Sequence, residues 1–168
     1  MKRYSIWLGA IAVILVAFFW RYTAVNQGVV DPVREVIVPK QKQISAHNVQ
    51  FEVLQIAKAT HGSVTNVDVS LSLTQTGPAS YSLIKGNRSF IENMWLNIPY
   101  VSRSSLDYMS NADGSRVRSS DIFNQKKTFA LTLHFSTDTK NVQAANFSPR
   151  FSFLVPDGQT FTKYSVLI

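Results

Sequence analysis

The stretch NVDVSLSLT, residues 66–74, alternates apolar and polar side chains without a break. Successive residues of a β-strand point to opposite faces, so the two kinds of side chain would lie on opposite sides of an extended chain. The apolar set is Val67, Val69, Leu71 and Leu73. The stretch therefore predicts a strand with one buried face and one face in water.

A second stretch, TFALTLHF at residues 128–135, has the same alternation. Weaker strand candidates lie at residues 49–57, 93–101, 147–155 and 160–168. Turn-forming sequences separate them, at residues 76–78, 85–87, 113–114 and 157–158. No long stretch of helical period occurs among them. The fold class predicted for residues 44–168 is all-β, an antiparallel β-sandwich with an immunoglobulin-like arrangement.

The last two strand candidates are expected to form a hairpin. Pro156 cannot donate a backbone hydrogen bond and is expected to end the first strand, and Asp157 and Gly158 supply the turn. The chain finishes on Val166, Leu167 and Ile168, so we expect the last strand to be built into the sheet.

Near its amino terminus the chain has a different character. Residues 6–20, IWLGAIAVILVAFFW, contain no charge, and the run from Tyr4 to Tyr22 would span roughly 28 Å as a helix, close to the thickness of a bilayer's hydrocarbon core. We expect a transmembrane anchor at residues 4–22. Its membrane-interface residues would be Tyr4, Trp7, Trp20 and Tyr22.

The orientation of this anchor follows from its flanking charge. Lys2 and Arg3 precede the apolar stretch, which favours a cytoplasmic amino terminus and an extracytoplasmic carboxyl-terminal domain, although Arg21 on the other flank weakens the bias. The expected location is the cell membrane, with a single pass. A cleaved signal peptide and a buried core helix are the alternatives.

The expected domain organisation has four parts: a cytoplasmic tail at residues 1–3, the anchor at 4–22, an extended linker at 23–43 and the sandwich domain at 44–168. Gly28, Pro32 and Pro39 punctuate the linker and favour an extended tether. Alternatively, residues 36–38 could form a first edge strand that Pro39 ends.

Composition limits the function classes. The chain has no cysteine, which excludes disulfides and thiolate metal sites. Its net charge is +7, but three of the 17 Lys and Arg residues, Lys2, Arg3 and Arg21, flank the apolar stretch, so residues from 31 onward carry 14 against 10 Asp and Glu. This mild excess suits an anionic envelope or headgroup surface and is too small to predict nucleic-acid binding.

The order of these parts resembles a known family. An apolar anchor, a tether, the strands VQFEVLQIAKA, NVDVSLSLT and KKTFALTLHF, and a closing pair around PDGQ are similar to small membrane-anchored or lipid-modified extracytoplasmic immunoglobulin-like domains of Gram-positive bacteria. The lipid-carrying cysteine common in such proteins is absent. The resemblance implies a sandwich over residues 44–168 and no defined reaction.

Catalytic and metal motifs are missing. His47, His61 and His134 are scattered, no Gly-x-Ser-x-Gly sequence occurs, and residues 109–114 lack the carboxylates of a calcium loop. We therefore expect no metal, no cofactor and no enzymatic activity. His134, on the wet face of a strand, is expected to be solvated or paired across strands.

One segment, residues 102–127, gathers basic side chains among serines and Tyr108. The candidate anionic-ligand residues are Arg103, Arg116, Arg118, Lys126 and Lys127. Arginine forks suit phosphate groups, so the ligand could be an anionic envelope polymer or lipid headgroups. Because Asp107, Asp113 and Asp121 lie in the same segment, a solvated loop of mixed charge is the alternative.

The predicted function is that of a membrane-anchored extracytoplasmic binding or accessory module without catalytic activity. The alternative is a single-pass subunit of a larger cell-envelope complex for secretion, transport or cell-wall work, with a membrane protein as partner. Gly9, Ala10 and Ala12 are small enough for another helix to approach closely.

Overall fold

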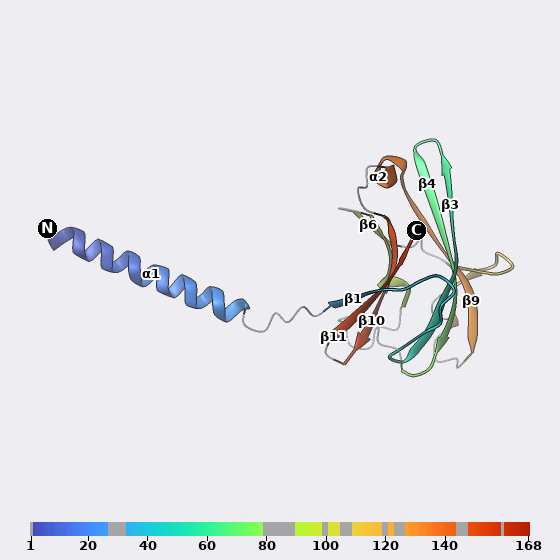
Figure 1. Ribbon diagram of the computed structural model, residues 1–168, viewed down its shortest axis with the longest axis horizontal. Helices are drawn as coiled ribbons and strands as arrows, with labels where there is room; N and C mark the ends of the chain where they lie inside the picture. The colour runs from blue at the N-terminus through green and yellow to red at the C-terminus, as the bar shows by residue number, and fades with distance from the viewer. Residues whose placement is uncertain are drawn as a thin grey trace. The chain divides into compact units, whose positions relative to one another are not determined.

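A computed structural model describes residues 2–26, 33–78, 90–98, 101–104, 109–118, 121–122, 127–143, 148–158 and 160–168 (Figure 1). Within these ranges the side chains of residues 2–6, 8, 10, 26, 101, 103 and 104 lie outside the description. The chain divides into two compact units, Met1–Pro32 and Val33–Ile168.

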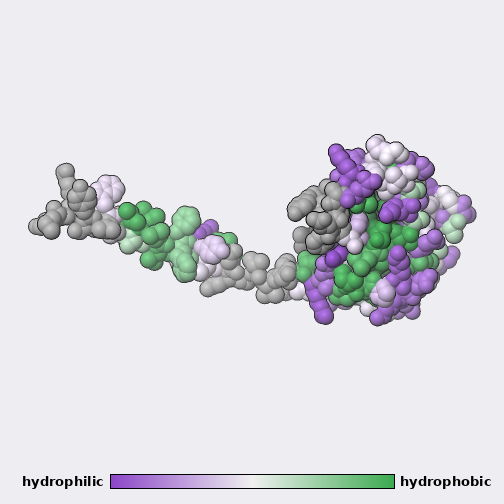
Figure 2. Space-filling view, turned by 45° about the horizontal axis from the view of Figure 1, so that its top comes forward, coloured by the Kyte–Doolittle hydropathy of each residue, from purple (hydrophilic) through white to green (hydrophobic). Residues whose placement is uncertain are grey.

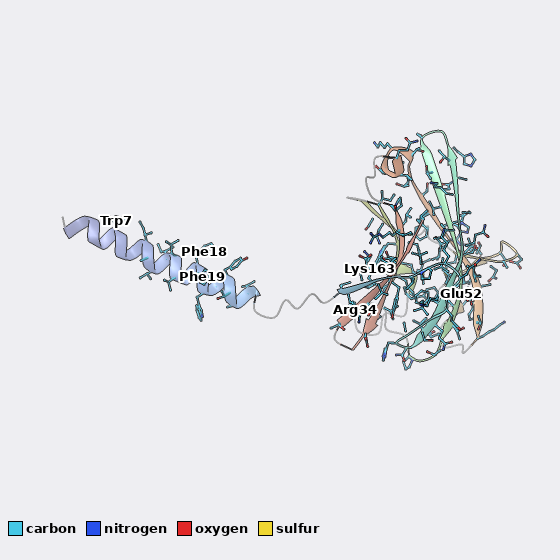
Figure 3. All side chains as sticks on the ribbon, in the orientation of Figure 1. Trp7, Phe18, Phe19, Arg34, Glu52 and Lys163 are labelled. Carbon is cyan, nitrogen blue, oxygen red and sulfur yellow. The ribbon has the colours of Figure 1, made fainter. Side chains whose placement is uncertain are left out.

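The first unit contains one helix, α1 (Lys2–Asn26), which includes the whole of the predicted anchor. Trp7, Phe18 and Phe19 point away from its axis, and each is at least 70% exposed (Figure 3). In the described part of the chain, no helix has both the length and the apolar character needed to cross a membrane.

The second unit consists of two facing sheets, as predicted for a sandwich (Figure 1). The five-stranded sheet contains, in spatial order, β1 (Val33–Ile37), β11 (Thr160–Leu167), β10 (Arg150–Asp157), β5 (Met94–Ile98) and β6 (Val101–Ser104). The six-stranded sheet contains β2 (Ile44–Ala46), β3 (Val49–His61), β4 (Val64–Gln75), β9 (Thr128–Asp138), β7 (Met109–Asn111) and β8 (Arg116–Val117). Two short helices, η1 (Phe90–Asn93) and α2 (Thr139–Gln143), accompany them.

The strand order can be compared with that of an immunoglobulin domain. The run β3-β4-β9-β7 has the connectivity of immunoglobulin strands A, B, E and D, and the run β11-β10-β5-β6 has that of G, F, C and C′. β2 and β1 extend these two sheets at one edge of each.

The core lies between the sheets and uses the alternation seen in the sequence. Val67, Val69, Leu71 and Leu73 of β4 are all buried, and β9 buries Leu131, Leu133 and Phe135. Aromatic rings join the two layers edge to face: the Phe51 ring lies 5.1 Å from that of Phe153 and 5.4 Å from that of Tyr164. Such pairs add about 0.5–1.5 kcal/mol to the free energy gained by burial.

The predicted closing hairpin is present. Phe151 pairs with Val166 and Phe153 with Tyr164. The expectation that Pro156 ends the first strand is wrong, because β10 continues to Asp157, which pairs with Thr160. β5 pairs with β10 only as far as Phe153. Pro156 lies beyond this pairing, so its missing N–H costs no hydrogen bond between β5 and β10.

The predicted linker at residues 23–43 needs correction, because it contains the end of α1 and a strand of the sandwich. β1 pairs in parallel with β11, with Val36 opposite Tyr164. Val38, which follows it, is buried and donates a backbone hydrogen bond of 2.8 Å to Ser165. The alternative of an edge strand before Pro39 is therefore confirmed in kind, although the strand covers Val33–Ile37 instead of residues 36–38, and the compact unit begins at Val33 instead of residue 44.

We predict that a chain ending at Lys163 is unfolded or insoluble. The deletion removes Val166, which is 2% exposed, the Tyr164 ring that contacts Phe51, and the pairing partners of Val36 and Ile37. A fully buried side chain of this kind contributes about 1.5–3 kcal/mol, against a total stability of about 5–15 kcal/mol for a typical domain.

Thermal unfolding followed by circular dichroism measures this effect. The control is Asp157→Asn, which should unfold close to wild type because Asn serves the same turn before Gly158. A truncated chain that melts within a degree or two of wild type would contradict the role of β11.

Candidate functional site

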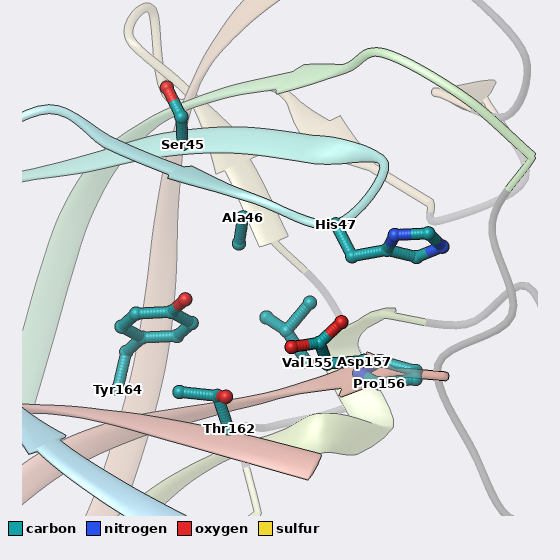
Figure 4. Close-up of a pocket in the computed structure, with 8 residues that line it drawn as sticks. All are labelled: Ser45, Ala46, His47, Val155, Pro156, Asp157, Thr162 and Tyr164. Atoms are coloured by element: carbon teal, nitrogen blue, oxygen red, sulfur yellow. The ribbon is translucent and has the colours of Figure 1, made fainter. Parts of the chain in front are cut away.

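A cavity of about 250 Å³ lies between the two sheets beside the β10–β11 turn (Figure 4). One wall comes from β2 and the turn after it, and the other from the two strands of the closing hairpin. The lining residues are Ser45, Ala46, His47, Val155, Pro156, Asp157, Thr162 and Tyr164.

Two tight turns position the polar side chains of this cavity. His47 and Asn48 connect β2 to β3, and Asn48 has a φ of 61°, a left-handed conformation that asparagine tolerates well. The Asn48 carbonyl accepts a 2.9 Å hydrogen bond from the N–H of Thr76, which fixes the turn to the end of β4. On the opposite wall, Asp157 precedes Gly158, whose φ of 64° makes the second turn.

The cavity is lined mainly by polar groups, and His47 and Asp157 among them are exposed while Tyr164 is half-buried. Among the described residues, the side chains of His47, Asp157 and Tyr164 make no hydrogen bond to one another or to their neighbours. Burial and the nearby Asp157 carboxylate raise the pKa of the Tyr164 phenol, while Arg34 opposes this shift. A neutral phenol, an imidazole and a carboxylate are therefore available to a ligand.

A second polar cluster lies on the outer face of the six-stranded sheet. His134 on β9 lies opposite Asp68 on β4, and its Nδ1 is 2.8 Å from Asp68 Oδ1. Its Nε2 is 2.8 Å from the hydroxyl of Ser110 on β7. A carboxylate can only accept, so Nδ1–H donates to Asp68, and in the neutral imidazole Nε2 then accepts from Ser110. The imidazole is paired across strands, one of the two states predicted for it.

This cluster has the connectivity of a Ser-His-Asp triad, but it lacks other parts of a hydrolase site. Ser110 is only 7% exposed and is paired in the sheet with Thr132 on one side and Arg116 on the other. A catalytic serine also needs oxyanion donors and a concave site for the substrate. The described residues around Ser110 are strand residues that supply neither, so the arrangement accounts for a rigid cross-strand link.

The predicted basic residues do not come from one strand. Arg116 in β8 and Arg118 just after it are exposed at one edge of the six-stranded sheet. Lys127 precedes β9, with its Nζ 5.8 Å from the centre of the Phe129 ring. The backbone of Arg103 belongs to β6 in the other sheet. Lys126, Tyr108 and the side chain of Arg103 lie outside the described residues.

The predicted membrane-interface residues belong to α1. Trp7, Trp20 and Tyr22 are exposed, and the side chain of Tyr4 lies outside the description.

A third polar cluster crosses the whole five-stranded sheet. Ser102 donates to Asn97, Asn97 donates to Ser152, and Ser152 bonds Ser165, with distances of 2.8, 2.6 and 2.8 Å. Ser165 then donates to Glu35 over 2.6 Å. The sequence did not reveal this chain of bonds, because its last member lies in the segment interpreted as a linker.

Glu35 is the charged end of that chain. Arg150 lies 3.2 Å and Lys163 3.4 Å from its Oε1. The hydrogen bond from Ser165 has the largest effect on the pKa of this carboxyl and lowers it, and the charge of Lys163 (Figure 3) lowers it further, despite the opposing effect of burial. The ionised form of Glu35 therefore stabilises the position of β1 on the sheet.

Comparisons with known proteins address the fold. No protein-family model matches the sequence, and no curated protein matches it. The structure is similar to the crystal structure of an uncharacterised β-sandwich protein from Clostridium difficile 630, with a TM-score of 0.53 and 8% sequence identity. The match covers 79% of this chain and 94% of that chain. At this identity the likeness shows a shared β-sandwich fold alone.

We predict that Glu35 makes the stability of the sandwich depend on pH. Its pKa is lower in the folded chain than the ordinary value of 4.5, so its contribution is present above that value and is lost as the pH falls through the folded pKa. The free energy of unfolding in urea should therefore fall more steeply with acid in wild type than in Glu35→Gln.

Glu52→Gln is the matched control, since it removes a carboxyl on β3 that takes no part in the Glu35 cluster. If the curves of wild type and Glu35→Gln have the same slope below pH 4.5, the cluster does not contribute as stated.

Proposed function

We propose that this chain is a membrane-anchored extracytoplasmic binding module without catalytic activity, and that its ligand enters the cavity between β2 and the closing hairpin. The observation that carries this proposal is the set of polar groups without partners, on His47, Asp157 and Tyr164, around one cavity. In ligand sites, a few convergent polar groups of this kind fix the orientation of the ligand.

The size and charge of the cavity favour a small hydroxylated ligand with a positive group. A volume of about 250 Å³ lies just below the roughly 300–1,000 Å³ of typical ligand pockets, which favours a ligand no larger than a single sugar ring. The Asp157 carboxylate can only accept hydrogen bonds, and it attracts an ammonium. The hydroxyls of Thr162 and Tyr164 can bond sugar hydroxyls. An amino sugar, as part of an envelope polysaccharide, combines these features.

The amino-terminal helix supports attachment to a membrane. Its described side chains are apolar and exposed along much of α1, including Val13, Ile14 and Val16 (Figure 2). Lys2 and Arg3 precede the apolar stretch, which supports a cytoplasmic amino terminus. The sandwich would then lie outside the cell membrane.

A single-pass subunit of a larger envelope complex is the second candidate. One observation favours it: among the described residues, no side chain of α1 lies within 4 Å of a Cβ added at Gly9, which leaves room for another helix there. Small residues allow close approach of helices in lipid.

We predict that the full-length protein in detergent micelles binds glucosamine more tightly than glucose. Removing the charge with Asp157→Asn should weaken glucosamine binding by about tenfold, equal to about 1.4 kcal/mol, and leave glucose binding unchanged. Nuclear magnetic resonance shifts of His47 and Tyr164 during titration would report binding.

Asp113→Asn, at an exposed aspartate on the β7–β8 turn, is the control. If wild type binds both sugars with equal affinity, or if both variants lose the same glucosamine affinity, the cavity is not the ligand site.

We also predict that protease added to intact cells or spheroplasts digests the sandwich domain, since the proposed orientation puts it outside. Immunoblotting with an antibody against residues 44–168 would follow the digestion, and lysed cells serve as the control. Full protection in intact cells with digestion after lysis would show that the orientation is wrong.

A further inference from the structure

The strand β3 has a long edge that the rest of the sheet leaves open. β2 pairs with β3 only from Val49 to Phe51, and Gln41 then donates one backbone bond of 2.8 Å to Val53. From Leu54 to His61, no described residue pairs with this edge, whereas the opposite edge pairs with β4 throughout except at Leu54. Figure 1 shows the β3–β4 hairpin extending beyond β1 and β11.

The register identifies the free backbone groups. His61 pairs with Val64 across the two-residue turn at Gly62 and Ser63, so this pair carries the first ladder bonds of the hairpin. Every second residue shares the orientation of His61, so the N–H and C=O groups of Ala57 and Ala59 also point toward β4. The N–H and C=O groups of Ile56, Lys58 and Thr60, which lie between them, therefore point away from β4. Lys58 and Thr60 are exposed to solvent, and Ile56 is half-buried.

An open edge of this kind can accept another extended chain. Backbone groups along such an edge bind a peptide as an added strand, and alternate side chains decide which peptide fits. The side chains beside the free groups, from Ile56, Lys58 and Thr60, lie on the same face as the buried Val67 and Val69 of β4. Every second side chain of an added strand would therefore lie next to one of these three: the apolar Ile56, the positive Lys58 or the hydroxyl of Thr60.

Charge distinguishes between the possible occupants. Lys58 is the one charged residue between Leu54 and Ser63, and the chain from residue 31 onward has a positive balance. A second copy of the same edge would bring another Lys58 close to the first, and like charges across neighbouring strands are unfavourable. A strand with a carboxylate opposite Lys58 would have the complementary charge.

We propose that the open edge of β3, from Leu54 to His61, binds an extended segment of a partner protein that places an acidic side chain opposite Lys58 and an apolar one beside Ile56. This edge shares no residue with the lining of the cavity, so a test of peptide binding at the edge is independent of the proposed sugar ligand.

The experiment uses the full-length protein in detergent micelles and a blocked synthetic peptide in which Thr and Val flank a central Glu. Amide hydrogen exchange is measured by nuclear magnetic resonance. With saturating peptide, exchange at Ile56, Lys58 and Thr60 should slow by about tenfold or more, while Ala57 and Ala59, whose N–H groups face β4, should change little. A peptide with a central Lys should give no protection.

Variants at Lys58 test the edge directly. Lys58→Pro should abolish protection by the Glu peptide, because the proline removes an outward N–H and leaves the bonds to β4 intact. Lys58→Glu, which preserves the backbone, should reverse the preference so that the Lys peptide protects the edge; this variant decides the matter if the proline variant does not fold.

Three results would overturn the proposal. The first is protection of these amides that is equal for Glu and Lys peptides, and the second is the absence of any protection. The third is protection that depends on protein concentration without peptide, together with a dimer in analytical ultracentrifugation, since the occupant of the edge would then be a second copy.

Discussion

The contact of Phe51 with Phe153 and Tyr164 joins the two sheets, and other features of the domain depend on it. Phe51 belongs to β3, and its two partners belong to neighbouring strands of the other sheet, so three strands are fixed by one cluster of rings. Tyr164 also lines the cavity and lies opposite Val36 of β1. The packing that stabilises the core therefore also sets one wall of the candidate ligand site and the position of the first strand.

The outer faces of the sheets are ordered by polar links instead of ring contacts. On one sheet the bonds run from Ser102 to Glu35 through all five strands, and on the other His134 connects Asp68 with Ser110. Ser152 and Ser165 are fully buried although they lie on an outer face, and their bond to each other satisfies both hydroxyls. Such links restrict strand register, because a slip of one residue would separate the partners.

Local pattern predicted much of the fold, and long-range pairing explains what it missed. The alternation in NVDVSLSLT and TFALTLHF placed β4 and β9 correctly, because a period of two needs only neighbouring residues to be recognised. β1 was predicted mainly as linker, since VREVI becomes a strand through its parallel pairing with β11, more than 120 residues later. The cavity and the link between Asp68, His134 and Ser110 also depend on strand register. No spacing in the sequence indicated that these side chains meet.

One residue in β3 has a consequence for how the chain can vary in length. The pairing with β4 shifts between Val53 and Gln55, which leaves Leu54 without a partner and 38% exposed. Before this bulge in the chain, Phe51 and Val53 face the core, and after it Ile56 faces the core. The extra residue, Leu54, therefore separates two segments of β3 that are each correctly paired with β4. Loss of Leu54 would join these segments into one regular strand with every other pairing kept. A deletion elsewhere in β3 would turn part of its core-facing set toward water. Homologous chains that differ by one residue in this strand would therefore be expected to differ at position 54.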